Sequence, residues 1–225
     1  EGLTVAAFYK RYKGVLSDLE LHPGFIEKPF DMGIEKPFDQ IDEYSSYDWD
    51  YIKRFWRLMM WNNSVFQEFS GRFYGKTCPV HLYWHHMDLT VTRFSGKKLP
   101  PMDRAARISD KDAYSHEQIS FGFWVGDNDV QEPMYYSYTY PSPDGIDHRQ
   151  LSPPQAFWQD ANGSAMALLR YEDVRNSDDP RGSVLEFLET AYQAGATLAG
   201  VKAAAEPRRA ESTAAVFIVG YCQLL

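Results

Sequence analysis

The sequence predicts an α+β fold, in which an antiparallel β-sheet is flanked by helices. Apolar residues recur at helical spacing near both ends of the chain, whereas the middle of the chain alternates between polar and apolar residues as strands do. The 225 residues, of which 44% are hydrophobic, suffice for one domain with a substantial core. We therefore expect a single domain over residues 1–204 and a tail of unassigned role over residues 205–225.

Two helices are expected before the sheet. The first begins after Thr4, a good capping residue, and its apolar positions recur at helical spacing as far as Leu19. The second begins at Ser46 or Asp48, which are both suited to capping, and ends near Phe69. The apolar side of each helix is expected to pack on the core.

Three strands are expected in the middle of the chain, at about 79–94, 117–126 and 132–140. The segments that end the second and third strands are rich in Gly, Asn, Asp and Pro, and these residues favour turns. Consecutive strands joined in this way are most simply arranged as an antiparallel meander.

Three further elements follow. The prolines at positions 153 and 154 predict the start of a short helix that continues through Trp158, and residues 166–171 are predicted as a short strand. A longer helix is expected to begin near Asp179, with Pro180 in its first turn, and to run to about Ala204.

Charge and composition argue against several classes of protein. The formal net charge of −8, with scattered Lys and Arg, is unlike a nucleic-acid-binding surface. No apolar run approaches the roughly 18 residues of a membrane span, and the start of the chain lacks the pattern of a signal peptide. Cys78 and Cys222 show neither metal-binding spacing nor a disulfide framework. We therefore expect a soluble, cytoplasmic protein without a nucleic-acid or membrane partner.

Polar side chains gather on one face of the predicted sheet. Alternation along the first strand separates Met87, Leu89 and Val91 from the polar residues between them. In the third strand the tyrosines are assigned to the apolar face. The polar face is then predicted to carry His86, Asp88, Thr90, Thr92, His116, Gln118, Ser120, Ser137 and Thr139.

This polar face has three interpretations. His86, Asp88 and His116 match the two-histidine, one-carboxylate ligand set of non-haem iron sites, so a divalent metal is one hypothesis. A ligand pocket without metal is the second, with Asp88 or His86 as acid or base and aromatic residues as walls. The aromatic wall residues of this hypothesis are Trp84, Tyr114 and Trp124. The third is a plain solvated face of a half-buried sheet, where polar residues belong anyway.

Two charged residues are expected to point to the opposite face. Glu117 is adjacent to His116 but alternates away from it. Arg93 falls on the apolar side, so it either lies beyond the edge of the sheet or is a buried guanidinium. A buried guanidinium requires a partner, either a carboxylate such as Asp48 or a bound anion.

Several blocks of the sequence together resemble one family. They are Gly75-Lys76 with Pro79-Val80-His81, Asp88-Leu89 with Thr92-Arg93-Phe94-Ser95-Gly96, Ala113-Tyr114-Ser115-His116-Glu117 with Ile119-Ser120-Phe121-Gly122-Phe123-Trp124, and Tyr136-Ser137-Tyr138-Thr139 with Pro141 and Pro143. The chain resembles, from about residue 5 to residue 200, a mainly bacterial family known as domain of unknown function fifty-nine ninety-six.

The resemblance has limited implications. Members of the family carry a further β-rich segment upstream, so we expect such a segment before residue 1. Five positions fall on the family pattern, namely His81, Asp88, Arg93, His116 and Glu117. Positions 85 and 86 often hold smaller residues in the family, which favours Asp88 with His116 over His86.

These observations lead to two hypotheses of function. The first is a small-molecule-binding or enzyme-like domain whose site is the polar face, with Asp88 and His116 central and Arg93, Tyr114 and Glu117 nearby. The second is a non-catalytic binding or interaction protein in which these residues are structural and exposed aromatic residues form the contact surface. The motifs of serine hydrolases, zincins and dinucleotide-binding folds are absent, so the sequence assigns no reaction type. It also leaves the oligomeric state open.

Overall fold

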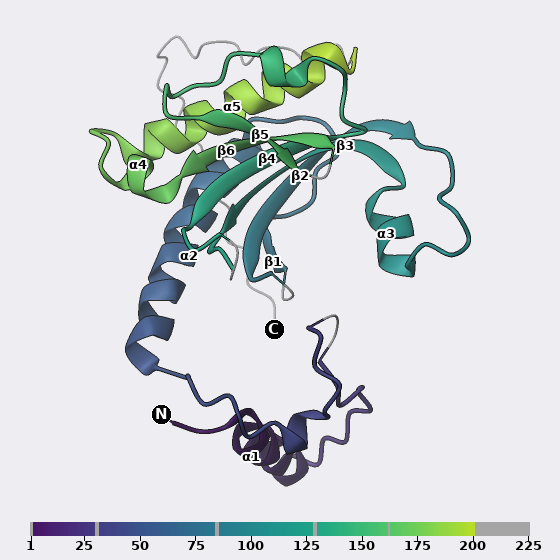
Figure 1. Ribbon diagram of the computed structural model, residues 1–225, viewed down its shortest axis with the longest axis vertical. Helices are drawn as coiled ribbons and strands as arrows, with labels where there is room; N and C mark the ends of the chain where they lie inside the picture. The colour runs from purple at the N-terminus through teal and green to yellow at the C-terminus, as the bar shows by residue number, and fades with distance from the viewer. Residues whose placement is uncertain (1, 30–31, 84–85, 128–129, 162, 201–225) are drawn as a thin grey trace, which may run out of the picture.

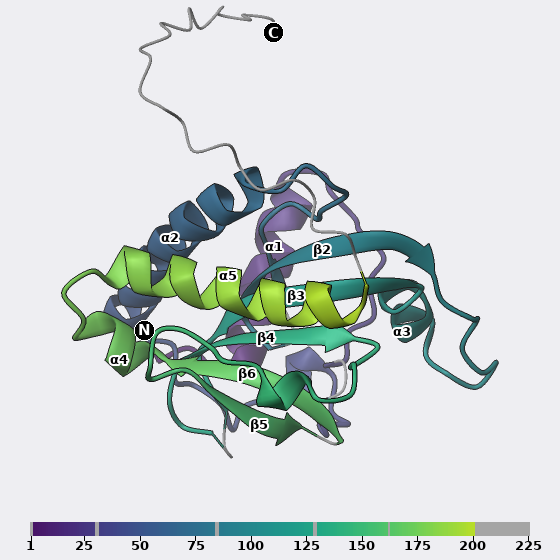
Figure 2. The same cartoon turned by 90° about the horizontal axis from the view of Figure 1, so that it is seen from above.

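The computed structural model describes residues 2–29, 32–83, 86–127, 130–161 and 163–200. It confirms the α+β fold: the described residues form a six-stranded antiparallel sheet that carries helices on one of its faces (Figure 1). Seen from above, α5 lies over the strands, and α2 lies beside α5 and extends beyond the sheet (Figure 2). Residues 205–225, predicted as a tail, lie outside the described residues.

The strands follow one another across the sheet in the order β1-β2-β3-β4-β6-β5, and each neighbouring pair is antiparallel. Their bounds are β1 His81–Tyr83, β2 Asp88–Lys98, β3 His116–Trp124, β4 Met134–Tyr140, β5 Phe157–Ala161 and β6 Ser164–Arg170. The meander predicted for the middle of the chain is therefore present and is extended by a hairpin of β5 and β6.

The three long helices are those that the sequence predicts, except that the last one ends at Leu198 rather than near Ala204. They are α1 Val5–Asp18, α2 Trp49–Gly71 and α5 Pro180–Leu198. Side chains at the expected positions cap them, because Thr4, Asp48 and Asp179 each accept a hydrogen bond from a backbone N–H of the first turn. The short elements α3 Ile108–Ala113, α4 Tyr171–Arg175, η1 Phe38–Gln40 and η2 Ile146–His148 were not predicted.

Two predicted elements were wrong. The single strand expected at 79–94 is a hairpin, in which β1 turns back so that His81 pairs with Thr90. Met87 has a φ of 55° at this turn, a left-handed conformation that side-chain alternation does not reveal. The short helix expected from position 153 to Trp158 is instead a turn followed by strand β5, which begins at Phe157. Pairing of β5 with β6 through a turn at Gly163 overrides the local helix signal of the prolines.

The face of the sheet beneath α2 and α5 is the hydrophobic core. Val91, Phe121 and Leu169 are fully buried there, and the ring of Phe121 packs edge-on against Phe69 of α2 at 4.8 Å between centroids. Helix α5 approaches closely because Gly195 has no Cβ; a Cβ at that position would lie 2.2 Å from Thr139 Oγ1. The core therefore includes small polar side chains of β4 where the helix crosses it.

The assignment of β4 to faces was also wrong. Ser137 and Thr139 point to the core face, since they pair with Phe121 and Ile119, and Tyr136 and Tyr138 lie on the opposite face. The physical reason is that α5 needs small side chains beneath it, whereas a tyrosine buries its ring on the sheet and keeps its hydroxyl for a polar partner.

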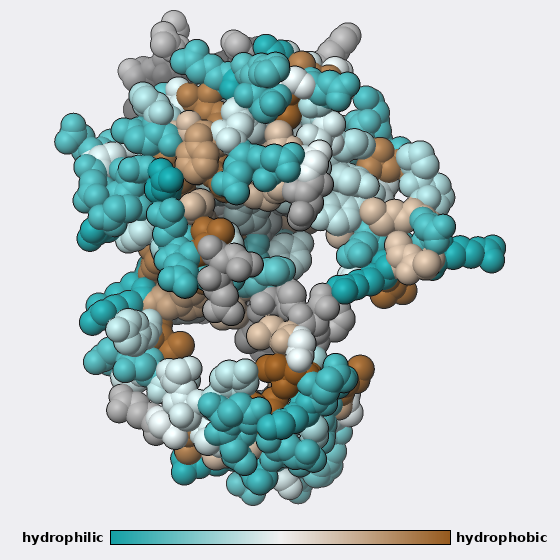
Figure 3. Space-filling model, in the orientation of Figure 1, coloured by the Kyte–Doolittle hydropathy of each residue, from teal (hydrophilic) through white to brown (hydrophobic). Residues whose placement is uncertain are grey.

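The described residues of 2–47, which we call the arm, lie apart from the sheet and are joined to it by α2 (Figure 1). Within the arm, Val5 N donates to Tyr44 O at 3.0 Å and Ala6 N donates to Ile41 O at 2.9 Å. Most of the large hydrophobic side chains that are exposed belong to the arm and the first half of α2. Figure 3 shows a hollow between the arm and the sheet.

None of the helices within the described ranges combines the length and the apolar character needed to cross a bilayer.

Replacing Gly195 by Ala tests the close contact between α5 and the sheet. The Cβ of an alanine at this position would lie 2.9 Å from Ile119 Cδ1 and closer still to Thr139. We therefore expect the free energy of unfolding, measured by urea denaturation, to decrease by about 1–3 kcal/mol. This loss should exceed the gain from the better helix propensity of Ala. Adding Thr139→Ala should restore part of the loss. Gly71→Ala in the last turn of α2 is the control, because no atom lies within 4 Å of a Cβ there; an equal loss for both glycines would contradict this account.

Candidate functional site

A cavity of about 570 Å³ lies on the face of the sheet opposite α2 and α5, and we call it the polar-face cavity. Strands from β2 to β6 contribute to its lining. Residues that line it include His86, Asp88, Trp124, Tyr136, Phe157 and Leu168. Neighbouring strands place Trp124 opposite Met134, and Leu168 opposite both Tyr136 and Phe157, so the apolar part of the lining is one continuous surface.

Asp88 is the acidic centre of this cavity and is only 8% exposed. Thr90 Oγ1 donates a hydrogen bond to Asp88 Oδ2 at 3.1 Å, and Tyr136 Oη donates a short one to the same oxygen. The two hydroxyl oxygens are also 3.1 Å apart. A nearly buried carboxylate is thus held by two hydroxyl donors, which compensate for part of the hydration it loses.

Tyr136 reaches Asp88 across an intervening strand because Gly122 has no side chain. Gly122 on β3 pairs with Thr90 on one side and with Tyr136 on the other. A Cβ at Gly122 would lie 2.3 Å from Cζ of the tyrosine, so the ring occupies the space that a side chain would fill. This glycine is required for close approach rather than for an unusual backbone conformation.

Two tyrosines on the open face of β4, Tyr136 and Tyr138, have raised pKa values. Burial, followed by the charge of Asp88, raises the pKa of Tyr136 well above the ordinary value for a phenol. Burial also raises the pKa of Tyr138, and neighbouring Tyr114 adds to the effect. The rings of Tyr136 and Tyr138 are stacked at 6.3 Å between centroids. Tyr136 and Tyr138 therefore supply protonated hydroxyl groups to the polar-face cavity at physiological pH.

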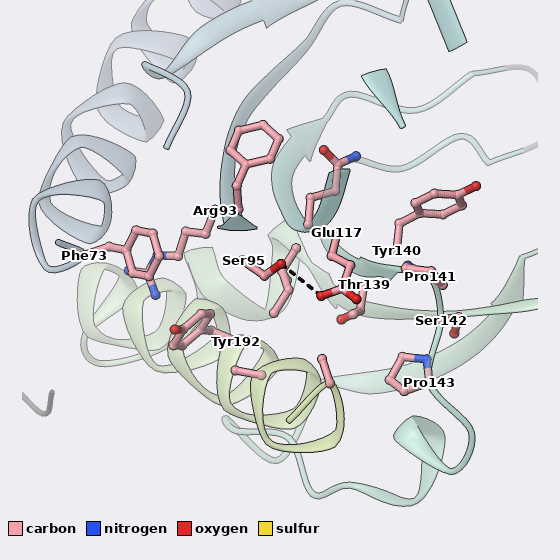
Figure 4. A pocket seen from close by; sticks show the side chains of 15 residues that line it. Phe73, Arg93, Ser95, Glu117, Thr139, Tyr140, Pro141, Ser142, Pro143 and Tyr192 are labelled. Atoms are coloured by element: carbon pink, nitrogen blue, oxygen red, sulfur yellow. Dashed lines mark hydrogen bonds between the residues drawn. The ribbon is translucent and has the colours of Figure 1, made fainter. Parts of the chain in front are cut away.

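A second cavity, of about 210 Å³, lies on the other face between β2–β4, the second half of α5 and the loop after β4; we call it the helix-face cavity (Figure 4). Arg93 and Glu117 both line it. Glu117 Oε2 accepts a hydrogen bond from Ser95 Oγ at 2.9 Å and lies 3.4 Å from Lys97 Nζ.

Arg93 is a buried guanidinium with 3% of its surface exposed, so it does not lie beyond the edge of the sheet. Its Cζ is 3.6 Å from the ring centroid of Phe69 and 4.5 Å from that of Tyr192, and Nη2 donates to the Phe69 carbonyl at 2.7 Å. The carboxylate beside it is Glu189, 3.9 Å from Nη1, and not the expected Asp48. Burial lowers the pKa of Arg93 to about 10.

The structure divides the predicted site residues between these places. The polar-face cavity is lined by His86, Asp88 and Trp124. The helix-face cavity is lined by Arg93 and Glu117. The prediction that these last two residues point away from the polar face was therefore correct.

His116 does not join Asp88. It pairs with Lys98 at the far end of β2, roughly 30 Å along the strand from Asp88 at the usual rise per residue. Its Nδ1 lies 3.0 Å from Ser115 Oγ. The proposed metal ligand set of His86, Asp88 and His116 is therefore not assembled, and no cluster of three His, Cys, Asp or Glu side chains suited to a metal ion occurs among the described residues.

Of the two remaining aromatic residues of the prediction, Tyr114 lines neither cavity. Tyr114 packs against Tyr140 at 4.5 Å between ring centroids. Trp84 lies outside the described residues. The residue that sequence reasoning missed is Tyr136, and the signal that identifies it is the paired Gly122, which leaves room for a large side chain from the next strand.

Comparison with known proteins gives one match. The model of the family described as "Family of unknown function (DUF5996)" matches residues 1–207, and the chain belongs to this family. No curated protein and no solved structure matches the chain significantly.

Replacing Gly122 by Ala should displace the Tyr136 ring and break its hydrogen bond to Asp88. We expect a loss of about 1–3 kcal/mol in the free energy of unfolding, as for other overpacked sites. A double-mutant cycle with Tyr136→Phe provides the decisive measurement, because the second substitution should cost little once the first has broken the bond. Fully additive losses would show that the glycine does not position this tyrosine.

The buried tyrosines also predict instability in alkali. Tyr135, Tyr136 and Tyr138 have raised pKa values in the folded protein, so above the ordinary value of 10.0 the folded state retains protons that the unfolded state loses, and stability falls as pH rises. Arg93 acts in the opposite direction, since its folded pKa is lowered, but it is one group against three.

Urea denaturation between about pH 9 and 11 measures this slope. Tyr138→Phe should reduce it by up to one proton, or about 1.4 kcal/mol per pH unit. An unchanged slope in this variant would mean that Tyr138 ionises as freely in the folded state as in the unfolded state.

Proposed function

We propose that this member of the DUF5996 family binds a small molecule in the polar-face cavity, with Asp88 and Tyr136 as its polar anchors. The observation that carries the proposal is the nearly buried Asp88 carboxylate, held by Tyr136 and Thr90 at the floor of a cavity of about 570 Å³. Ligand pockets are typically a few hundred to a thousand Å³, mostly apolar, with a few fixed polar groups.

The lining indicates the kind of ligand. Trp124, Phe157 and Leu168 offer apolar and aromatic surface, whereas the carboxylate of Asp88 offers hydrogen-bond acceptors. The other charges of the lining offset each other, because Arg170 Nε lies 3.2 Å from Glu132 Oε1. The cavity therefore suits a molecule with an apolar or aromatic body and one amine or hydroxyl group that donates to Asp88.

Protein interaction is the second candidate function. It is supported by the arm, whose large hydrophobic side chains are exposed to an extent unusual for the surface of a soluble monomer. In that case Asp88 would be a purely structural group, so substitutions at Asp88 separate the two candidates.

Titration of the protein with 2-phenylethylamine, 2-phenylethanol and ethylbenzene, followed by ¹H–¹⁵N NMR, tests the proposed function. These probes share one aromatic body and differ in the donor group. We expect the amine and the alcohol to shift amide signals of β2, β4 and β6, and to bind at least about tenfold more tightly than ethylbenzene, a difference of about 1.4 kcal/mol. Asp88→Asn, which keeps the shape but removes the charge, should weaken the amine by a similar factor.

Asp173→Asn on α4 is the matched control, because Asp173 does not line the cavity. Its affinities should equal those of the unsubstituted protein. Equal binding of all three probes, or equal binding of the amine by Asp88→Asn, would contradict the proposal. A large loss of stability in Asp88→Asn without any probe binding to the parent protein would favour the structural role instead.

A further inference from the structure

The helix-face cavity carries opposite charges at two places on its lining. Figure 4 shows Arg93 at one side, beside Phe73 and Tyr192, and Glu117 with its bond from Ser95 at the other. The two groups do not form an ion pair: the acidic partner of Arg93 is Glu189, and the basic partner of Glu117 is Lys97. The cavity therefore presents both a cation and an anion to whatever occupies it.

The guanidinium of Arg93 uses little of its hydrogen-bonding capacity. Five N–H groups are available in a guanidinium, and Nη2 donates to the Phe69 carbonyl at 2.7 Å. Its Nε is buried without a partner, and Nη1 is 3.9 Å from Glu189, beyond hydrogen-bond distance. Buried donors without partners are costly, so an anion at this end of the cavity would supply what the protein does not.

The carboxylate of Glu117 is the complementary group. Its side chain is 23% exposed, and Ser95 Oγ fixes one of its oxygens at 2.9 Å. Lys97 is 60% exposed, so its attraction for Glu117 is screened by solvent. Glu117 thus retains acceptor capacity for a ligand ammonium group.

The spacing and the walls define the ligand further. Arg93 and Ser95 are two residues apart on one strand, with about 6.6 Å between their Cα atoms, and the guanidinium of Arg93 extends away from its Cα to Phe69 of α2, so the two charges are well separated. Apolar groups also line the cavity, among them Ile119, Pro143 and Ala196. The volume of about 210 Å³ exceeds the roughly 150 Å³ of a cavity that holds benzene. A short aliphatic chain with separated charges matches these dimensions.

We infer that the helix-face cavity is a binding site for a small amino carboxylate whose ammonium and carboxylate groups are separated by an aliphatic linker. Its carboxylate would lie at Arg93 and its ammonium group at Glu117. This site is on the opposite face of the sheet from the polar-face cavity, and the inference does not depend on the function proposed for that cavity.

The test uses 5-aminopentanoate, together with pentanoate and pentylamine as singly charged probes of similar length and glycine as a zwitterion without a linker. Binding is followed by ¹H–¹⁵N NMR through the amides of Ser95, Glu117 and Thr139. We expect 5-aminopentanoate to bind at least about tenfold more tightly than each of the other three. Glu117→Gln should lower its affinity to that of pentanoate while leaving pentanoate itself unaffected.

Two control variants accompany this test. Glu186→Gln changes an exposed glutamate of α5 that does not line the cavity, and it should leave every affinity unchanged. Asp88→Asn should also leave 5-aminopentanoate binding unchanged, which separates this site from the polar-face cavity. Absence of binding at millimolar concentrations, equal affinity for pentanoate and 5-aminopentanoate, or full retention of affinity in Glu117→Gln would overturn the inference.

Discussion

The buried guanidinium of Arg93 joins the sheet to the two helices that cover it, α2 and α5. It extends from β2, stacks on aromatic rings of α2 and α5, and donates to the Phe69 carbonyl in the last turn of α2. A cation is favourable there because carbonyl groups at the C-terminal end of a helix lack intrahelical partners and carry the negative end of the helix dipole. This one side chain therefore links β2 to both α2 and α5 and also forms part of the wall of the helix-face cavity.

Two glycines give the sheet its two different faces. Gly195 lets α5 settle onto the small side chains of β4, and Gly122 lets Tyr136 lie flat across β3 on the opposite face. The helix side of β4 therefore carries Ser137 and Thr139, and the open side carries Tyr136 and Tyr138, of which Tyr136 donates to Asp88. Alternation along a single strand thus supplies the helix-face cavity with one set of polar groups and the polar-face cavity with another.

Local signals in the sequence were sufficient for the long helices, because their caps and apolar spacing lie within one segment; Thr4, Asp48 and Asp179 act as predicted. Register between strands is not local. His116 was grouped with Asp88 because both are polar members of neighbouring strands, yet pairing and a bulge in β2 place it opposite Lys98. Tyr136 was assigned to the core because its ring is apolar, although its hydroxyl and the glycine beside it decide its side of the sheet. Arg93 was placed on the correct face, but its aromatic cage involves α2 and α5, which no strand pattern reveals.

Helix α2 also connects two parts of the chain that differ in burial, the arm and the sheet. Its second half is part of the core, with Phe66 and Phe69 fully buried, whereas its first half carries exposed residues such as Trp56. The arm beyond it is held by contacts among its own residues, such as the backbone bonds of α1 to Tyr44 and Ile41. Cooperative unfolding requires shared contacts, so we expect the arm and the sheet to be two separate units of stability. We therefore expect amide protons of the arm to exchange with solvent through local opening, at a free energy independent of that which protects the strands, with the boundary between the two regimes inside the single continuous helix α2.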